Sequence, residues 1–494
     1  MYMKKILIWT GVLSFYFFPA KVKIFAQSMP RVELPSNHYH LRYETLPTAA
    51  GGVLVLKKPV YRQNQLEVQY FDSLLLNQWS LDFEMDYAQH VVHYLHDQTL
   101  YLLIQQYNRF EYKLIQVHLP DGKAFEQPIF SIKQIEVEQF TASADGLYVL
   151  GRTKNTRLFY YIDLQTLQSK VIPLGLAPNS QILRLSFDAN YGNHLLTALE
   201  IQPDWSRSLV IYMLDKGIKT LALRVPSDDA HDFLSAEILS EPLRPMVVVG
   251  AYKHPRDGYA QGIYWVEINL NTLQQGIRYI PFVRLPHFFD FLPANAKQRQ
   301  LGKLAQQNEL VAARWRSPFQ AQVYQLAHHK QAYWLAVEFS VVENKREMQG
   351  SGLFQTVLAH RYHHALLVKL SDKGELLEDS FLPMNDVGSL LPQRNLATTI
   401  ETDKVMAMYV NQTHLHSSLH QLGVFSSTLV EQIPLAEALG LHRIHYSLSQ
   451  RLRHWYGRFF LLSGYQSVKY VGKASQRVYF LHKIPFYEPK SPHD

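Results

Sequence analysis

Closely spaced histidines are the residues in this sequence whose type and spacing most readily suggest chemistry. His414 and His416 are two residues apart, so on a strand both side chains would point to one face, and His420 follows near a turn. Neutral imidazole is a common metal ligand, but no carboxylates accompany these histidines at a matching spacing. We therefore interpret them as a packed or exposed row, with His414 and His416 as weak metal candidates, and predict no cofactor.

Two other groups of histidines lie in strand-like segments. His90, His93 and His96 are spaced by three, so on a strand they alternate between faces, which disfavours a shared ligand set. A further group lies at the base of a predicted hairpin, and there we predict a binding role for His360, Tyr362 and His363, beside His364.

Carboxylate groups offer acid and base chemistry in principle. Asp228 with Asp229 could serve glycoside cleavage, and so could the alternating set Asp82, Glu84 and Asp86, although a solvated face is the favoured interpretation of that set. The sequence has no Gly-x-Ser-x-Gly elbow and no phosphate-binding glycine loop. Prolyl-peptidase-type catalysis and nucleotide-dependent chemistry therefore find no support.

Tryptophans and arginines outside the strand pattern are candidates for recognition. Arg314, Trp315 and Arg316 follow a predicted helical segment, and we predict a binding surface there. Trp205 and Trp455 are further loop candidates, whereas the tryptophans within the strand pattern are predicted to pack in the core, namely Trp79, Trp265 and Trp334.

The elements that must position these residues follow a repeat. A strongly apolar strand recurs eight times, and the first five copies begin 47, 47, 48 and 51 residues apart. These copies are Val53 to Leu56, Leu100 to Ile104, Leu147 to Leu150, Leu195 to Leu199, Met246 to Gly250, Tyr333 to Val337, Val405 to Tyr409 and Phe459 to Ser463.

Each copy is followed by a second alternating strand and then by a short closing strand, and a preceding strand can usually be drawn. Asp-Gly and Asp-Lys-Gly turns at Gly122, Gly217 and Gly374 suit β-hairpins. About four strands per unit predict an all-β fold, a seven- or eight-bladed β-propeller, in which His40 to Leu46 completes the last blade. Two packed β-domains or an open solenoid is the alternative.

Two segments interrupt the repeat. Pro286 to Ala313, rich in Gln, Ala, Lys and Leu, predicts a helical insertion at about 286–313. Glu338 to Leu366 predicts an extended hairpin at about 338–366, with arms Ala336 to Val342 and Thr356 to Tyr362 around Gln349-Gly-Ser-Gly352.

A resemblance follows from this second segment. The stretch from Tyr333 to Leu376, read as YWLAVEFSVV, then GSG, then HRYHHALLVKLSDKGEL, resembles a pattern in exported bacterial β-propeller proteins of uncharacterised function. The resemblance implies an exported propeller and brings no known activity or functional residue with it.

The remaining features concern the location of the protein. Residues 1–27 have the pattern of a signal peptide, with Lys4 and Lys5 before the apolar run Ile6 to Phe18, so the predicted mature domain is a single propeller over 28–494. The chain has no cysteine, which excludes disulfides and a lipid-modified cysteine. Removal of the four lysines before Gln27 lowers the formal net charge from +7 to +3 in the predicted mature chain. The sequence contains no basic run of the kind that would indicate nucleic-acid binding.

The sequence therefore favours a non-catalytic exported propeller, in the periplasm, on the outer surface or outside the cell. We predict that it binds a protein or glycan partner through the two insertions, because function tends to reside in loops held by a rigid scaffold. The alternatives are a carbohydrate-active enzyme with a site in a central pocket and a purely structural envelope protein. The sequence predicts no later membrane-spanning segment and does not indicate an oligomeric state.

Overall fold

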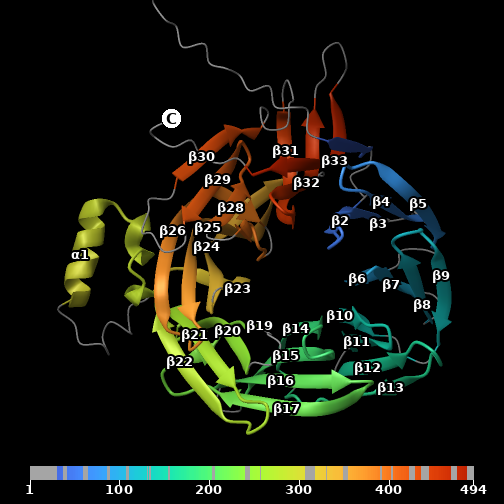
Figure 1. Cartoon of the computed structure of the whole chain (residues 1–494), viewed down its shortest axis with the longest axis horizontal. Coiled ribbons are helices and arrows are strands. Elements are labelled where there is room, and N and C mark those ends of the chain that lie inside the picture. The colour runs from blue at the N-terminus through green and yellow to red at the C-terminus, as the bar shows by residue number, and fades with distance from the viewer. Residues whose placement is uncertain are drawn as a thin grey trace, which may run out of the picture.

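Eight antiparallel sheets form one ring, so the protein is an eight-bladed β-propeller (Figure 1). The computed structural model describes residues 30–486 apart from 37–41, 59–64, 86–89, 107–110, 131, 133–134, 154–155, 178, 203–205, 240–244, 256, 306–316, 330, 349–353, 390–391, 402–403, 422–428, 436–443 and 469–474. The predicted signal peptide, residues 1–27, lies outside the described residues.

Each blade begins at its innermost strand and is numbered here in chain order. Blade 1 contains β2 (Arg42–Pro47), β3 (Val53–Lys58), β4 (Gln65–Phe71) and β5 (Asn77–Glu84), and blade 2 contains β6 (His90–His96), β7 (Thr99–Gln106), β8 (Glu111–His118) and β9 (Ala124–Ile129). Blade 3 contains β10 (Glu136–Ala142), β11 (Gly146–Arg152), β12 (Arg157–Asp163) and β13 (Ser169–Val171), and blade 4 contains β14 (Gln181–Asp188), β15 (Asn193–Ile201), β16 (Arg207–Asp215) and β17 (Ile218–Pro226).

The second half of the ring follows the same order, except that blade 5 has a split inner strand and blade 8 takes its outer strand from the beginning of the chain. Blade 5 contains β18 (Asp232–Phe233), β19 (Glu237–Leu239), β20 (Met246–Lys253), β21 (Gly262–Ile268) and β22 (Gln275–Pro281), and blade 6 contains β23 (Gln320–His329), β24 (Ala332–Met348), β25 (Phe354–Ser371) and β26 (Leu376–Ser389). Blade 7 contains β27 (Ala397–Glu401), β28 (Lys404–Val410), β29 (His414–Gln421) and β30 (Leu429–Pro434), and blade 8 contains β31 (Ile444–Tyr456), β32 (Phe459–Val468), β33 (Gln476–Pro485) and β1 (Arg31–Pro35).

The recurring apolar strand of the sequence is the second strand of every blade, which confirms the predicted repeat. These strands are apolar on both faces because each blade is covered by a neighbour on either side. Among the described residues, one hydrophobic cluster fills each of the eight interfaces between neighbouring blades. The core is therefore a ring of eight inter-blade layers.

Turn chemistry also follows the sequence. Gly122, Gly217 and Gly374 have φ of +66°, +70° and +73°, a backbone region that glycine enters without steric cost. At Gly374 an added Cβ would lie 2.5 Å from the Trp265 ring, so this glycine also permits a close approach between blades 5 and 6.

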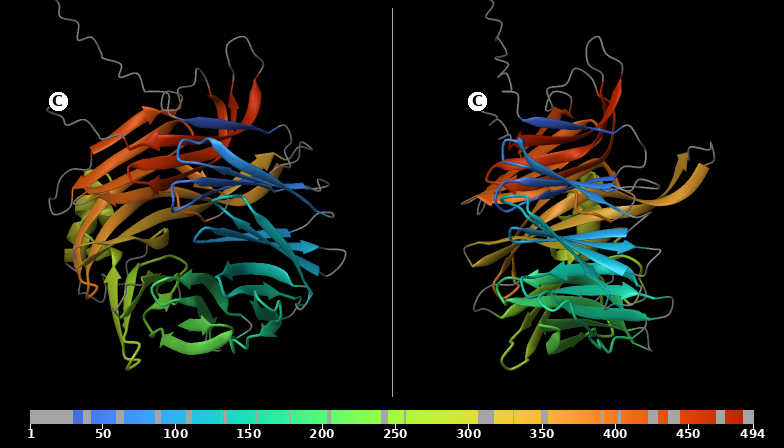
Figure 2. Two further views of the ribbon diagram at one scale, coloured as in Figure 1. Left: turned by 45° about the vertical axis from the view of Figure 1, so that its right-hand side comes forward. Right: turned by 90° about the vertical axis from the view of Figure 1, so that its right-hand side faces the viewer.

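Ring closure differs from the sequence prediction. Residues 42–46 of the predicted closing strand belong to β2, the innermost strand of blade 1, and the preceding two lie outside the described residues. The closing strand is instead β1, which pairs with β33 from Arg31↔His482 to Pro35↔Val478. Figure 2 shows β1 as the blue strand beside the red strands of blade 8.

Side chains of blades 1 and 8 hold this seam together. The rings of Tyr43 and Tyr479 stack with centroids 4.6 Å apart. The Trp455 indole N–H donates to the Gly52 carbonyl oxygen at 3.0 Å. Lys483 Nζ donates to the Ser73 carbonyl oxygen at 3.1 Å and lies 4.0 Å from the centre of the Phe459 ring.

Blade 6 carries the largest departures from a regular blade. Between β22 and β23 the chain forms two 3-10 turns, η1 (Phe282–Arg284) and η2 (Phe288–Phe291), and then the helix α1 (Ala294–Ala305). Strands β24 and β25 are 17 and 18 residues long and remain paired as far as Met348↔Phe354. No helix in the described part of the chain is long and apolar enough to cross a bilayer.

Candidate functional site

The innermost strands of blades 1 and 2 bring a small charged group together at the inner edge of the ring. Lys58 Nζ, at the end of β3, lies 2.7 Å from Glu44 Oε2 on β2 and 3.3 Å from His93 Nδ1 on β6. The pKa of His93 is lowered to about 4, and burial is the largest cause of this shift. Burial alone would raise the pKa of Glu44, but the positive charges of protonated His93 and of Lys58 hold it below its ordinary value. At neutral pH this group is therefore a neutral imidazole beside an ion pair.

Two arginines of blade 8 face the same group. Arg451 and Arg453 alternate along β31 with the buried Leu452, so both lie on the face toward blade 1, and both are exposed. Arg453 donates from Nη1 to the Thr45 carbonyl oxygen of β2 at 3.3 Å. Desolvation, followed by the neighbouring charge of Arg451, lowers the pKa of Arg453 below its ordinary value.

A third arginine reaches this region from the loop that enters blade 7. The Arg394 guanidinium lies 4.1 Å above the Tyr324 ring, and its charge also acts on Arg453. Its Nε donates to the Leu396 carbonyl oxygen and its Nη2 to the Thr398 hydroxyl, both at 3.2 Å. We call Lys58, Arg394, Arg451 and Arg453 the basic arc. Among the described residues, no carboxylate pairs with its three arginines.

On the other side of the ring, basic side chains near the inner strands are matched by acids. Glu138 of β10 accepts from Arg152 and Arg157, and the closest contact to each arginine is 2.5 and 2.9 Å, respectively. Arg184 of β14 pairs with Glu237 of β19 at 2.6 Å. The charges of blades 3 to 5 therefore largely cancel, whereas those of the basic arc do not.

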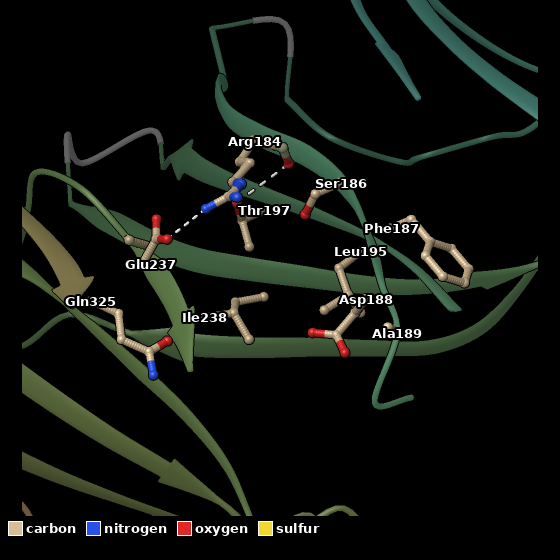
Figure 3. A pocket seen from close by; sticks show the side chains of 11 residues that line it. Arg184, Ser186, Phe187, Asp188, Ala189, Leu195, Thr197, Glu237, Ile238 and Gln325 are labelled. Carbon is tan, nitrogen blue, oxygen red and sulfur yellow. Dashed lines mark hydrogen bonds and ion pairs between the residues drawn. The ribbon is translucent and has the colours of Figure 1, made fainter. Parts of the chain in front are cut away.

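A cavity of about 250 Å³ lies beside the Arg184–Glu237 ion pair (Figure 3). Its lining comes from blades 4, 5 and 6 and includes Ser186, Thr197 and Gln325. Asp188, at its edge, accepts from the backbone N–H groups of Asn190 and Tyr191 in a turn. The charged side chains of its lining are thus already engaged, Arg184 with Glu237 and Asp188 with the turn.

A buried carboxylate joins blades 6 and 7. Glu338 of β24 is 1 % exposed and accepts from the Tyr324 hydroxyl. It also accepts from the backbone N–H groups of Leu396, at 2.9 Å, and Asn395, at 3.1 Å. Burial raises the pKa of Glu338 above its ordinary value even though these donors act in the opposite direction. These hydrogen bonds all join Glu338 to neighbouring groups of blade 6 and of the loop before blade 7, so the arrangement fits a structural role.

The long strands of blade 6 continue beyond the sheet as a two-stranded ribbon. β23 pairs with β24 only as far as Ser340, and β26 pairs with β25 only as far as His360. From Glu343↔Ala359 to Met348↔Phe354, the two arms have only each other as partners among the described strands. The gold and orange strands project from the ring in the side view of Figure 2. We call residues 343–348 and 354–359 the ribbon.

Helix α1 lies outside the ring, beside blade 6 (Figure 1). None of its residues is buried, and Leu301 is 41 % exposed. It contains Lys297, Arg299 and Lys303 but no acidic residue, and Lys297 pairs with Asp290 of η2. The helix is thus a basic element attached to the scaffold through η2.

The residues predicted to bind at the hairpin base separate into different environments. The Tyr362 side chain is buried, and its hydroxyl donates to the Gln393 carbonyl oxygen at 2.7 Å. His360 lies near the base of the ribbon with Nδ1 3.5 Å from the Ser340 hydroxyl. His363 is exposed and contacts the Phe291 and Phe319 rings.

The neighbouring His364, considered with that group, is completely buried. Its ring stacks between Phe339, at 4.4 Å, and Phe291, at 4.9 Å, and burial lowers its pKa well below the ordinary value. Arg314, Trp315 and Arg316, predicted as a recognition surface, lie outside the described residues.

The histidines weighed as metal ligands pack against protein. The His416 ring stacks on Tyr409 at 4.3 Å, and Nε2 lies 3.1 Å from the Asn411 side-chain amide nitrogen. His414 contacts the Thr413 hydroxyl at 2.8 Å, and its ring centre is 6.1 Å from that of His416. In the described part of the chain, no group of three histidine or acidic side chains could hold a metal ion.

The carboxylates proposed for acid and base chemistry lie far from one another. Asp82 and Glu84 are in β5, the outer strand of blade 1, and Asp86 lies outside the described residues. Asp228 accepts from His231 Nδ1 at 2.8 Å in the loop that enters blade 5, and the His231 ring stacks on Tyr279 at 3.7 Å. Among the tryptophans, Trp455 is buried in the seam between blades 8 and 1.

Sequence reasoning missed the basic arc and Glu338. The four members of the arc belong to blades 1 and 8 and to the loop before blade 7, so only the closed ring brings them together. No local spacing could have indicated them. The one available signal was the pair Arg451 and Arg453, whose period of two is that of a strand.

Comparison with known proteins gives no family assignment. No protein family and no curated protein sequence matches the chain. Among solved structures, the polysaccharide lyase Uly1 is similar with a TM-score of 0.41 and 8 % identity, covering 82 % of this chain and 91 % of that protein. Prolyl oligopeptidase B from Galerina marginata gives 0.42 and 9 %, covering 86 % of this chain and 55 % of that one.

A third similar structure is a propeller domain. The β-propeller domain of the Trilobed protease from Pyrococcus furiosus gives a TM-score of 0.32 and 9 % identity, covering 72 % of this chain and 98 % of that domain. The fold and the site are therefore judged from the residues of this chain.

Proposed function

We propose that the protein is an exported, non-catalytic β-propeller that binds a protein or glycan partner through the insertions of blade 6. The ribbon is the observation that carries this proposal. Two strands that pair only with each other are marginally stable in water, since three or more strands are normally needed to build a hydrophobic face. A partner that covers the ribbon would supply the missing contacts.

The exposed surface of the ribbon favours a protein partner over a glycan. Leu358 is 63 % exposed, although large apolar side chains on the blades are mostly buried. The backbone groups on the outer edges of the two arms are available for pairing with an added strand, as far as the described strands show.

The alternative of an enzyme with a central site receives less support. Glu44, Glu138 and Glu237, on three inner strands, are each paired with a basic side chain. A carboxylate held in an ion pair keeps its charge, which suits neither the raised pKa of a general acid nor a free base.

Site-specific photo-crosslinking from the ribbon tests the proposal. A photoreactive residue at position 358 should give one discrete protein adduct in cells that produce the protein. The matched control places the same residue at Val171, which is 54 % exposed on the outer strand of blade 3. In parallel, the purified protein is screened against a panel of glycans.

A shortened variant separates binding from folding. Replacing residues 343–359 by an Asn-Gly turn keeps the pair Val342↔His360 as the end of the hairpin and should leave the melting temperature nearly unchanged. The proposal predicts that this variant loses the adduct or the glycan binding. Identical adducts from positions 358 and 171, or neither adduct nor glycan binding, would show that the ribbon is not a binding element.

A further inference from the structure

The basic arc carries an excess of positive charge at the inner edge of the ring, because its four basic side chains interact with only two acids in the described part of the chain, Glu44 and Glu338. None of its three arginines forms an ion pair with a carboxylate among the described residues, and Lys58 forms an ion pair with Glu44. Elsewhere near the inner strands, arginines are matched by a carboxylate, as in the cases of Arg152, Arg157, Arg184 and Arg207. The excess charge is therefore a local feature of the part of the ring from blade 7 to blade 2.

The backbone presents these side chains in a specific way. The pairing of β31 with β32 shifts register between Leu448 and Arg451, directly before the two arginines. Such bulges re-aim the side chains that follow and are common beside functional sites. Here the bulge is followed by Arg451 and Arg453 on the face toward Glu44 and Thr45.

Like charges held this close repel each other, so the arrangement destabilises the empty protein. Arg453 is held toward the arc by its bond to the Thr45 carbonyl oxygen, and Arg394 by its position over the Tyr324 ring. The guanidiniums are thus oriented, and although the charges of Glu44 and Glu338 act on them, none forms an ion pair with a carboxylate among the described residues. A planar guanidinium presents paired N–H donors that match the oxygens of carboxylate and phosphate groups.

We propose that the basic arc is a binding site for a small ligand that carries at least two oxyanion groups, either carboxylates or phosphates. More than one anionic group is required because the donors come from the loop before blade 7, from blade 8 and from blade 1. His93, as a neutral ring at the edge of the arc, can accept or donate one further hydrogen bond. The site is separate from the ribbon and does not depend on the function proposed for it.

Calorimetric titration of the full mature chain with three probes tests this site. Tricarballylate and trigalacturonate present carboxylates on a short carbon chain and on sugars, and tripolyphosphate presents phosphates. The wild-type protein should bind at least one probe, more weakly as salt is raised. The tightest probe identifies whether the oxyanions belong to a small acid, a sugar acid or a phosphate.

Charge-removing variants locate the binding. The double variant R451Q/R453Q should weaken the best probe by roughly 100-fold or more, since each lost charge-assisted hydrogen bond is worth about one to two factors of ten. The single variant R451Q should lose roughly tenfold and leaves the Arg453–Thr45 bond in place. The matched control R299Q/K303Q removes the same charge from α1 and should bind as wild type does.

A second readout does not need a ligand. Because the arginines repel one another, R451Q should raise the melting temperature of the empty protein or leave it unchanged, and the difference should shrink at high salt. Absence of binding to all three probes, equal affinity in R451Q/R453Q, or an equal loss in the α1 control would overturn the proposal. Retained binding in the ribbon-shortened variant would confirm that the two sites are independent.

Discussion

Replacing Glu338 by alanine should weaken the interface between blades 6 and 7 more than most single changes in this protein. The substitution leaves three donors without their acceptor, namely the Tyr324 hydroxyl and the backbone N–H groups of Asn395 and Leu396. An unsatisfied buried donor costs about 1–3 kcal/mol. Since water can reach Asn395 in part, we expect a loss of about 3–6 kcal/mol in the free energy of unfolding.

Equilibrium unfolding in urea at pH 7, followed by tryptophan fluorescence, measures this loss. Trp334 lies in the hydrophobic cluster of the same interface and reports on it directly. Tyr324→Phe removes only one donor and should cost about 1 kcal/mol. Glu375→Ala is the surface control, because its ion pair with Arg278 is more than half exposed and should contribute little. A cost below about 1 kcal/mol for Glu338→Ala would refute the view that this carboxylate holds the two blades together.

Two further predictions concern blades 7 and 8. Burial lowers the pKa of His416 to about 4, so the stabilising contribution of its neutral ring is present above the unfolded pKa of 6.5 and is lost as the pH falls toward 4. Between pH 7 and pH 5, His416→Phe should therefore lose about 2 kcal/mol less of its free energy of unfolding than the wild-type protein loses. Lys483→Met removes the bond to Ser73 and the contact with Phe459 and should lower stability by about 1–3 kcal/mol in urea unfolding; an unchanged midpoint would show that this lysine does not help to close the ring.

The repeat was predictable because each blade encodes it locally. The second strand of each blade is buried on both faces, and its run of apolar residues therefore stands out in the sequence. The glycines at the hairpin turns add an independent local signal, since their positive φ is required by the turn.

Closure of the ring was not predictable in the same way. β1 and β2 are both short strands near the beginning of the chain, with 5 and 6 residues. The residues of neither strand indicate which sheet it joins. The choice is made by contacts with residues more than 400 positions away, such as the pair Tyr43 and Tyr479. The same reason hid the basic arc, in which Lys58 and Arg453 meet only after closure.

The predicted binding residues illustrate how burial alters an interpretation based on residue type. Tyr362 and His363 are adjacent in β25, and both pairings of this strand shift register so that His363 has no partner residue. This bulge leaves Tyr362 inside the interface between blades 6 and 7 and His363 at the surface. The composition of the segment could indicate a candidate surface, but only the register of the strand assigns each side chain to a face.

Hydrogen–deuterium exchange of the ribbon tests the central claim most directly. In the isolated protein, the amides of residues 343–348 and 354–359 should exchange much faster than those of residues 332–340 in the same strand, because the ribbon lacks a third strand and a core among the described residues. Addition of the partner identified by crosslinking, or of the bound glycan, should protect the ribbon and leave the other blades unchanged. Protection confined to another blade, with the ribbon still exchanging rapidly, would contradict a binding role for the blade 6 insertion.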